Sequence, residues 1–301
     1  MAARTRDIVV GFDGSGSAQA ALRWATRTAM LHRRAVTVVY VVAVPEIEAQ
    51  AVAWEVDDGP VSLRVPYERH ARRIVTEALD IVDDEVGAGQ RPEVVTDIIW
   101  AQPVPTLAAM TRDAELVVVG SRGQGSLRRA VMGSVSAGLV QHARCPVAVI
   151  HGQELSAEQA AEAARRPVLL GIDGSRASEL ATEVAFAEAA AREVDLIALH
   201  AWHDADLVGI AGQQWSDLVT RGEEVLAERL AGYREQYPDL TVRRLVVWGQ
   251  PAHHLLEHAE SAQLVVVGSH GRGGFTGMLL GSVSRAVVHG AEVPVIVARR
   301  F

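Results

Sequence analysis

Short apolar runs alternate with segments of helical periodicity along most of the chain. The first run, residues 6–13, is continuously apolar in its middle, which is typical of a buried strand in a parallel sheet. A Gly/Ser turn follows at 14–17, where a serine is expected to cap the next helix. Apolar residues then recur on one face of a helix predicted over 18–31. Alternation of strand and helix predicts an α/β fold with a parallel sheet covered on both faces.

The same pattern predicts the rest of the first half and then repeats. It gives strands at 35–44, 93–100, 116–119 and 147–150, helices at 67–86, 104–111 and 134–142, and a long loop at 45–66. In the second half it gives strands at 168–173, 196–200, 241–248, 264–267 and 295–298 and a long helix at 215–237. We therefore predict two tandem domains, 1–150 and 167–301, joined by a helical or loose linker at 151–166.

An internal duplication supports this division. Trp100 and Gly120 match Trp248 and Gly268 at one offset of 148 residues, whereas Asp13 matches its counterpart Asp173 at an offset of 160. The first half therefore carries 12 extra residues, and the 45–66 loop is the natural place for them. A repeat of this kind has to be recognised before any fold is assigned.

Both halves carry one glycine-rich pattern directly after a Leu-Val-Val-Val run. It reads G-x2-G-x9-G-S and ends on a serine that can open a helix. Glycine can simply permit a turn, but two copies with identical spacing favour a phosphate or nucleotide site built from backbone N–H groups and a helix N-terminus. Its residues are Gly120, Ser121, Arg122, Gly123, Gly125, Gly133, Ser134, Val135 and Ser136, repeated as Gly268, Ser269, His270, Gly271, Arg272, Gly273, Gly281, Ser282, Val283 and Ser284.

Two acidic residues occupy equivalent strand ends. Asp13 and Asp173 could cap helices, or could bond a ribose hydroxyl or an adenine amino group, since a carboxylate would repel phosphate. Ligands of doubly wound sheets bind beyond the carboxyl ends of the strands, where the strand order reverses. If the strands that end at Asp13 and Gly120 are neighbours there, the acid and the glycine loop share one crevice.

Two further sets of side chains leave alternatives open. The serines that follow the loops, Ser134 and Ser136 with their copies, could be helix caps, phosphate ligands or both. Arg122 and His270 lie at matching loop positions, where Arg122 could pair with phosphate or face solvent.

Composition removes several classes of protein. The 29 basic residues are all arginine, so chemistry that requires lysine, including the Walker A loop, is excluded. A net charge of −8 argues against binding nucleic acid through a broad basic face. His254 and His258 have helical i, i+4 spacing but share no motif with an acidic ligand, so we expect no metal site.

The remaining features concern location. Cys145 is the single cysteine, so the chain holds no internal disulfide, which fits a reducing compartment. No apolar run approaches the roughly 20 residues of a membrane span, and no secretory signal precedes the first strand. We expect a cytoplasmic protein.

Taken together, these motifs resemble the universal stress proteins in their tandem two-domain actinobacterial form. The resemblance rests on Val-Gly-Phe-Asp-Gly-Ser at 10–15, Leu-Gly-Ile-Asp-Gly-Ser at 170–175, both glycine patterns, and Cys-Pro-Val and Val-Pro-Val at 145–147 and 293–295. It implies two five-stranded parallel sheets of order 3-2-1-4-5, of the adenine nucleotide alpha hydrolase-like type. It also implies that the fifth strands make domain or dimer contacts, as in a homodimer.

The resemblance further implies ATP, usually with Mg²⁺, in each domain. In the first site, the adenosine would contact Asp13 and Val41, and Gly11 at the end of the first strand would also belong to the site. In the second site, the corresponding residues would be Asp173, Ala201 and Gly171. The loops would hold the triphosphate. Ala201 departs from the larger aliphatic residue that is usual there, which could loosen the packing of adenine.

Three functions follow as hypotheses. The first is a regulatory ATP-binding protein of the stress response with no catalytic residues. The second is a slow ATPase or an adenylating enzyme, although the loop S-G-G-x-D-S of related adenylating enzymes is absent after the first strand. The third is an interaction module with vestigial loops.

Overall fold

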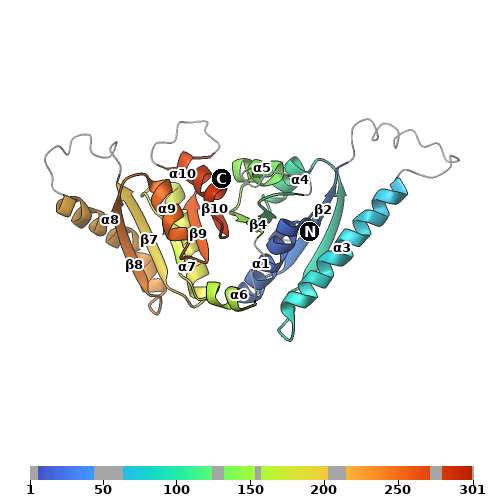
Figure 1. Ribbon diagram of the computed structural model, residues 1–301, viewed down its shortest axis with the longest axis horizontal. Coiled ribbons are helices and arrows are strands. Elements are labelled where there is room, and N and C mark those ends of the chain that lie inside the picture. Colours follow the sequence, from blue (N-terminus) through green and yellow to red (C-terminus); the bar gives the residue numbers. More distant parts are fainter. Residues whose placement is uncertain are drawn as a thin grey trace. The chain divides into compact units, whose positions relative to one another are not determined.

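The computed structural model describes residues 6–43, 64–123, 132–152, 157–202, 215–271 and 280–299. Contacts divide the chain into two compact units, Met1–Cys145 and Pro146–Phe301. Each unit is built around its own set of parallel strands with helices on both faces (Figure 1). The α/β fold predicted from the sequence is therefore confirmed.

The first unit contains four neighbouring parallel strands in the order β3-β2-β1-β4. The strands are β1 (Arg6–Gly11), β2 (Val36–Val42), β3 (Val94–Trp100) and β4 (Ala114–Gly120). Helices α1 (Gly16–His32) and α3 (Arg64–Val86) pack together on one side, and α4 (Pro103–Met110) and α5 (Ser134–His142) pack together on the other. The pairing of β1 with β4 meets the condition under which Asp13 and the glycine loop share a crevice.

The second unit contains the complete second repeat and one strand of the first. Its parallel strands β6 (Val168–Gly171), β7 (Leu196–Trp202), β8 (Val242–Trp248), β9 (Leu264–Gly268) and β10 (Val295–Ala298) follow the predicted 3-2-1-4-5 order. Strand β5 (Val147–Ile150) belongs to this unit and pairs with β10 in the antiparallel direction. The contact boundary after Cys145 thus precedes the predicted end of the first domain at residue 150, which stays a prediction.

The helices of the second unit repeat those of the first. Helices α7 (Arg176–Ala191) and α8 (Trp215–Gln236) contact each other, as do α9 (Pro251–Ala259) and α10 (Ser282–Gly290). The predicted linker contains a short helix, α6 (Ala157–Ala163). Among the helices that the structure describes, none combines the length and apolar character needed to cross a membrane.

The central strands of each unit are buried on two sides, as their apolar runs require, whereas the edge strands β3 and β8 are partly exposed. Val9, Val10, Val117 and Val118 have no solvent exposure. The long helix α3 begins three residues earlier than the predicted residue 67. Pro66 lies in the first turn, where proline is tolerated because the backbone N–H would have no partner within the helix. Most of the predicted 45–66 loop lies outside the described residues.

Candidate functional site

A cavity of about 310 Å³ opens at the carboxyl ends of β1 and β4 in the first unit. Its volume lies in the range of small-molecule sites, about 300–1,000 Å³. It is lined by Gly11, Phe12, Asp13, Ala18, Val39, Val41, Pro103, Leu107, Val119, Gly120, Arg122, Gly123, Gly133, Ser134, Val135 and Ser136. The structure therefore gathers most residues of the predicted first site around one space; Ser121 is buried beside it.

Asp13 organises the turn between β1 and α1. One carboxylate oxygen accepts hydrogen bonds from the Ser15 backbone N–H at 3.0 Å and the Ser15 hydroxyl at 2.6 Å. Ser15 is the N-cap of α1, as the sequence predicts, because its side chain accepts from the backbone N–H of Ala18. The turn passes through Gly14 at a φ of 78°, which glycine adopts without strain. Asp13 therefore positions the cap and is not the cap itself.

The glycine loop is closed at its ends by a backbone hydrogen bond. The Gly133 N–H donates to the Ser121 carbonyl at 2.8 Å. The Arg122 carbonyl in turn accepts from the Ser17 hydroxyl, and the Ser15 hydroxyl, whose one proton is donated to Asp13, lies 3.3 Å from the same carbonyl oxygen. These bonds fix the start of the loop against the turn after β1, so the acid and the loop lie side by side at one cavity.

The glycines of the loop are required for close approach to this turn. A Cβ on Gly123 would lie 2.7 Å from the second carboxylate oxygen of Asp13. A Cβ on Gly120 would lie 2.6 Å from the backbone carbon of Ser17, and one on Gly133 would lie 3.3 Å from the Cα of Arg122. Gly120 therefore serves the packing of β4 on α1, whereas Gly123 keeps the loop close to the acid.

Helix α5 points its N-terminus at the same cavity. Gly133 is its N-cap and makes no side-chain capping bond, so the first N–H groups of the helix, at Ser134, Val135 and Ser136, border the cavity without a capping side chain. The Ser136 hydroxyl donates instead to the carbonyls of Ser121 and Gly133, at 3.1 and 3.0 Å. Ser136 thus ties the loop to the helix, and Ser134, the first helical residue, is not a cap.

The opposite wall of the cavity is apolar. Val39 and Val41 of β2 and Pro103 and Leu107 of α4 are among its lining residues. Tyr40 lies between the two valines along β2, and burial, followed by the negative charge of Asp13, raises the pKa of its hydroxyl above 10. One side of the cavity can therefore pack a flat apolar group while the other presents backbone N–H groups.

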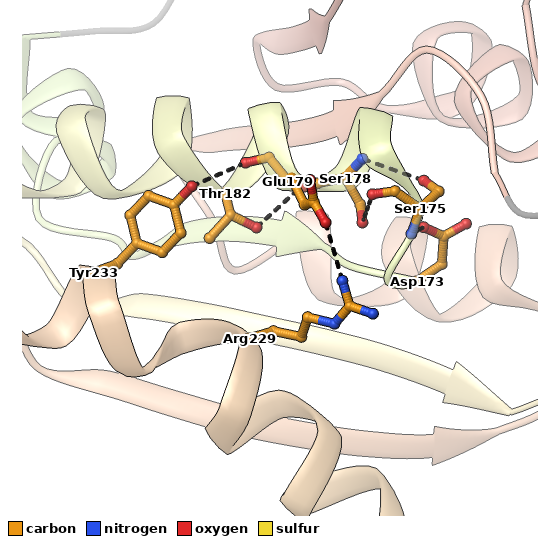
Figure 2. Close-up of polar contacts among 7 residues, drawn as sticks. All are labelled: Asp173, Ser175, Ser178, Glu179, Thr182, Arg229 and Tyr233. Carbon is orange, nitrogen blue, oxygen red and sulfur yellow. Dashed lines mark hydrogen bonds and ion pairs between the residues drawn. The ribbon is translucent and has the colours of Figure 1, made fainter.

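The second unit repeats the acidic turn. The Ser175 N–H donates to the Asp173 carboxylate at 2.9 Å, and the Ser175 side chain caps α7 by accepting from the Ser178 N–H. Figure 2 shows this cap beside two contacts that fasten α7 to α8, in which Arg229 donates to the Glu179 carboxylate at 3.0 Å and the Tyr233 hydroxyl reaches the Glu179 carbonyl. The N-terminus of α7 is thus fixed by the Ser175 cap, and the side of its first turns is fixed by the contacts with α8.

The second glycine loop repeats the closing backbone bond of the first but differs in the bond made by its second serine. The Gly281 N–H donates to the Ser269 carbonyl at 2.8 Å, and a Cβ on Gly271 would lie 2.7 Å from the Asp173 carboxylate. Gly268 lies against the backbone of α7 as Gly120 lies against α1, with its Cβ position 2.7 Å from a backbone carbon. The Ser284 hydroxyl donates to the Gly268 carbonyl at 2.5 Å. Helix α10 has the same uncapped start at Ser282 and Val283.

The two sites differ at several matched positions, and three of the differences change a polar contact or the size of a side chain named above. Ala177 replaces Ser17, so the His270 carbonyl takes its bond from Ser175 at 3.2 Å. His270 replaces Arg122, and its Nδ1 lies 3.0 Å from the Ser269 hydroxyl oxygen. Ala201, on β7, replaces Val41.

Some predicted site residues remain to be placed. Gly11 and Gly171 end β1 and β6, where a Cβ would contact a leucine of α4 or α9 and a valine of the neighbouring strand at 3.0–3.2 Å. Gly125, Arg272 and Gly273 lie outside the described residues.

The histidine pair also has a structural place. The Nε2 of His254 lies 2.7 Å from the Trp248 carbonyl oxygen. Within the described segments no three His, Cys, Asp or Glu side chains are grouped as metal ligands would be.

Sequence reasoning named Val41 but missed the other apolar lining residues, Val39, Pro103 and Leu107, and the hydroxyl bonds that hold the loop. Pro103 belongs to the repeated Trp-x-Gln-Pro pattern, and that repetition was a usable signal for its place beside the cavity. Ser15 and Ser17 were assigned only to a turn and a cap. Their contacts with a carbonyl more than 100 residues away have no local signature in the sequence.

Comparison with known proteins gives a consistent result. The model of the universal stress protein family matches residues 4–151 and again 164–299. Universal stress protein Rv2005c of Mycobacterium tuberculosis is 48% identical over 293 residues, covering 97% of both chains. Universal stress protein Rv2623 of the same species is 47% identical over 292 residues, covering 97% of this chain and 96% of that protein. The crystal structure of a universal stress protein from Archaeoglobus fulgidus matches the fold at 20% identity with a TM-score of 0.69, covering 99% of this chain and 100% of that one.

Proposed function

The chain belongs to the universal stress protein family, in its tandem two-domain form, and from this we propose that it is a regulatory protein that binds one ATP in each repeat. The observation that carries the proposal is the cavity at the end of β1 and β4, where an acidic turn, a glycine loop and an uncapped helix N-terminus converge. Each of these features has a counterpart in the second unit.

The residues around the cavity suit the separate parts of a nucleotide. Backbone N–H groups at the start of α5 suit phosphate, because helix N-termini attract anions. The loop glycines leave room where a Cβ would collide with Asp13. Val41 and Leu107 offer an apolar wall for adenine, and Asp13 offers a carboxylate for the ribose hydroxyls.

In the second repeat we assign the same roles to Asp173, Ala201 and the N-terminus of α10. Mg²⁺, bound with the nucleotide, would offset the charge of the phosphates. Bound ATP supplies three anionic phosphates, and the chain's own residues supply orientation and partial positive charge.

We propose binding without fast turnover. Phosphoryl transfer uses a lysine, a metal-holding acid or an arginine finger to stabilise the transition state, and this chain has no lysine. Asp13 is bonded to Ser15 through one oxygen and faces Gly123 with the other, which suits holding a ligand better than activating water. We propose further that the protein is cytoplasmic and acts as a homodimer on a protein partner, away from nucleic acid and membrane.

The test is the nucleotide content of the purified full-length chain. We expect native mass spectrometry in millimolar MgATP to find two adenine nucleotides per chain, and equilibrium dialysis to give the same number. A chain that binds no adenine nucleotide under these conditions would refute the proposal.

A second measurement separates binding from catalysis. Steady hydrolysis that is lost in the Gly123→Ala, Gly271→Ala double variant would instead support an ATPase. These positions are better suited than Gly120 and Gly268, whose substitution would push on helix backbone and disturb the fold.

A further inference from the structure

We propose that Ser17 is a positioning residue for the glycine loop of the first unit and that it strengthens nucleotide binding there, an advantage that the second site lacks. The inference rests on the proposed function and makes its two sites unequal. It starts from a hydroxyl group that is present in one repeat and absent from the other. Ala177 stands in the second repeat where Ser17 stands in the first, at the offset of 160 residues that also relates Asp173 to Asp13.

Ser17 is held between the end of β4 and the loop that follows it. Its hydroxyl donates to the Arg122 carbonyl, and a Cβ on Gly120 would lie 2.6 Å from the same hydroxyl oxygen. Gly120 and Arg122 line the cavity, whereas Ser17 does not. The Ser17 hydroxyl therefore acts on a bound nucleotide through the loop and not by touching it.

A second serine serves the acid of the first site. The Ser15 hydroxyl has one proton, which it donates to the Asp13 carboxylate at 2.6 Å. Because Ser17 donates to the loop carbonyl, the acid and the loop each receive a hydroxyl proton of their own. Both the acid and the start of the loop are therefore held in place before a ligand arrives.

In the second site one serine has both of these groups within its reach. The Ser175 hydroxyl donates to the His270 carbonyl at 3.2 Å, and the Ser175 backbone N–H donates to the Asp173 carboxylate at 2.9 Å. Ala177 has no hydroxyl with which to take over the bond to the loop. The hydroxyl proton that Ser175 gives to the loop cannot at the same time go to the acid, as the Ser15 proton does in the first site.

The additional hydroxyl matters for binding because the loop has to be ordered around a bound phosphate. Groups that are already held in their bound arrangement lower the entropy cost of binding. One neutral hydrogen bond changes an equilibrium constant by roughly two- to tenfold. We therefore expect the Ser17 hydroxyl to lower the Kd of the first site for MgATP by about this factor.

Charged residues near the two loops also differ, and their effect has to be separated from that of the hydroxyl. Arg122 of the first loop is matched by His270 in the second. The buried Arg299 follows β10, and its backbone lies beside the start of the second loop, because the Ala298 carbonyl accepts from the Ser269 N–H at 2.9 Å. A positive charge there favours an anion in the second site and so works against the effect of Ser17. Exchanging only serine and alanine leaves these charged side chains unchanged and isolates the hydroxyl.

Single-site proteins allow the effect to be measured in each repeat. Gly271→Val would close the second site and Gly123→Val the first, because each new side chain would collide with the acid of its site. In the Gly271→Val protein, Ser17→Ala should raise the Kd for MgATP roughly two- to tenfold. In the Gly123→Val protein, Ala177→Ser should lower the Kd by a similar factor. Calorimetry on the full-length chains gives these constants, and circular dichroism verifies the fold.

Thermal unfolding without nucleotide distinguishes positioning from a purely structural role. Gly16→Ala in the Gly271→Val protein is the control for a change beside Ser17, since nothing lies within 4 Å of the Gly16 Cβ position. A Kd of Ser17→Ala equal to that of this control would overturn the inference. It would do so even if the unfolding temperature fell, because the hydroxyl would then stabilise the fold without affecting binding.

A second measurement avoids the valine substitutions. Native mass spectrometry of the two-site chain at limiting MgATP gives the average number of nucleotides bound per chain. Ser17→Ala should lower this average and Ala177→Ser should raise it, relative to the unaltered chain. Equal occupancy of the three proteins would overturn the inference and leave the proposed function standing. Absence of nucleotide from all three would remove both.

Discussion

Replacing Gly123 by alanine tests the contact on which the first site depends. The new Cβ would lie 2.7 Å from one carboxylate oxygen of Asp13, well inside the distance that carbon and oxygen atoms tolerate. The carboxylate is held from the other side by two bonds from Ser15, at 3.0 and 2.6 Å. The Asp13 carboxylate can move away from the new methyl group only by weakening one of the bonds from Ser15. If the carboxylate stays in place, the glycine loop must move away from the turn.

The size of the effect follows from those bonds. A hydrogen bond to a charged group contributes about 1.5–3 kcal/mol, which corresponds to roughly a ten- to hundredfold change in Kd if the cost falls on binding. The fold should survive, because the displaced atoms are the end of a side chain. Gly120→Ala should behave differently, since its Cβ would meet helix backbone and lower stability as well.

The assay is the Kd for MgATP of full-length Gly123→Ala, measured in parallel with thermal unfolding. Binding at the second site could mask the change, so the Gly123→Ala protein and its control, described next, both also carry Gly271→Val. Gly16→Ala is the matched control, because Gly16 is the first residue of α1, close to the same turn, and nothing lies within 4 Å of its Cβ position. A Kd for Gly123→Ala that stays within about twofold of the control's, against the tenfold expected, would show that the contact between acid and loop takes no part in binding.

Three further predictions concern stability and ionisation. Gly232→Ala in α8 should raise the free energy of unfolding, measured by urea titration, by about 0.5–1 kcal/mol, because the Cβ position of Gly232 is open. Gly222→Ala in the same helix should lower the free energy of unfolding by about 1–3 kcal/mol, because the new Cβ would lie 2.7 Å from a valine methyl of β8. Equal effects of the two substitutions would contradict this reasoning. Ultraviolet titration should show a pKa of Tyr40 above the ordinary 10, and the Asp13→Asn variant should lower that pKa only in part, because burial is the larger cause of the shift and the Asp13 charge the smaller. The stability that the neutral Tyr40 contributes is present below pH 10 and is lost as the pH rises through the raised pKa. Ser175→Ala should cost about 1 kcal/mol through the lost cap, and an unchanged unfolding midpoint would count against that role.

The strands and loops could be predicted because their signals are local. Continuous apolar runs gave strand positions to within about two residues; β5 and β10, for example, cover 147–150 and 295–298 as expected. The repeat offset located the second acid and second loop without a partner sequence. Confirmed family membership follows from the same motifs.

The contacts that shape the site could not be predicted because they join distant segments. The reason for Gly120 is the backbone of α1, and the reason for Gly123 is a carboxylate 110 residues earlier in the chain. Position within the helix also left open whether Ser136 is a cap or a phosphate ligand, and it did not indicate the bonds that this side chain donates to loop carbonyls. Spacing alone records which residues are present but not which atoms they approach.

The antiparallel pair formed by β5 and β10 has a consequence for dividing the protein. A fragment cut after residue 150 would take β5 with the first repeat and leave β10 with bare N–H and C=O groups along one side. Such an edge invites pairing with other chains, so this fragment should aggregate or associate with itself. A fragment that begins at Pro146 keeps this antiparallel pair intact and should not expose β10 in the same way.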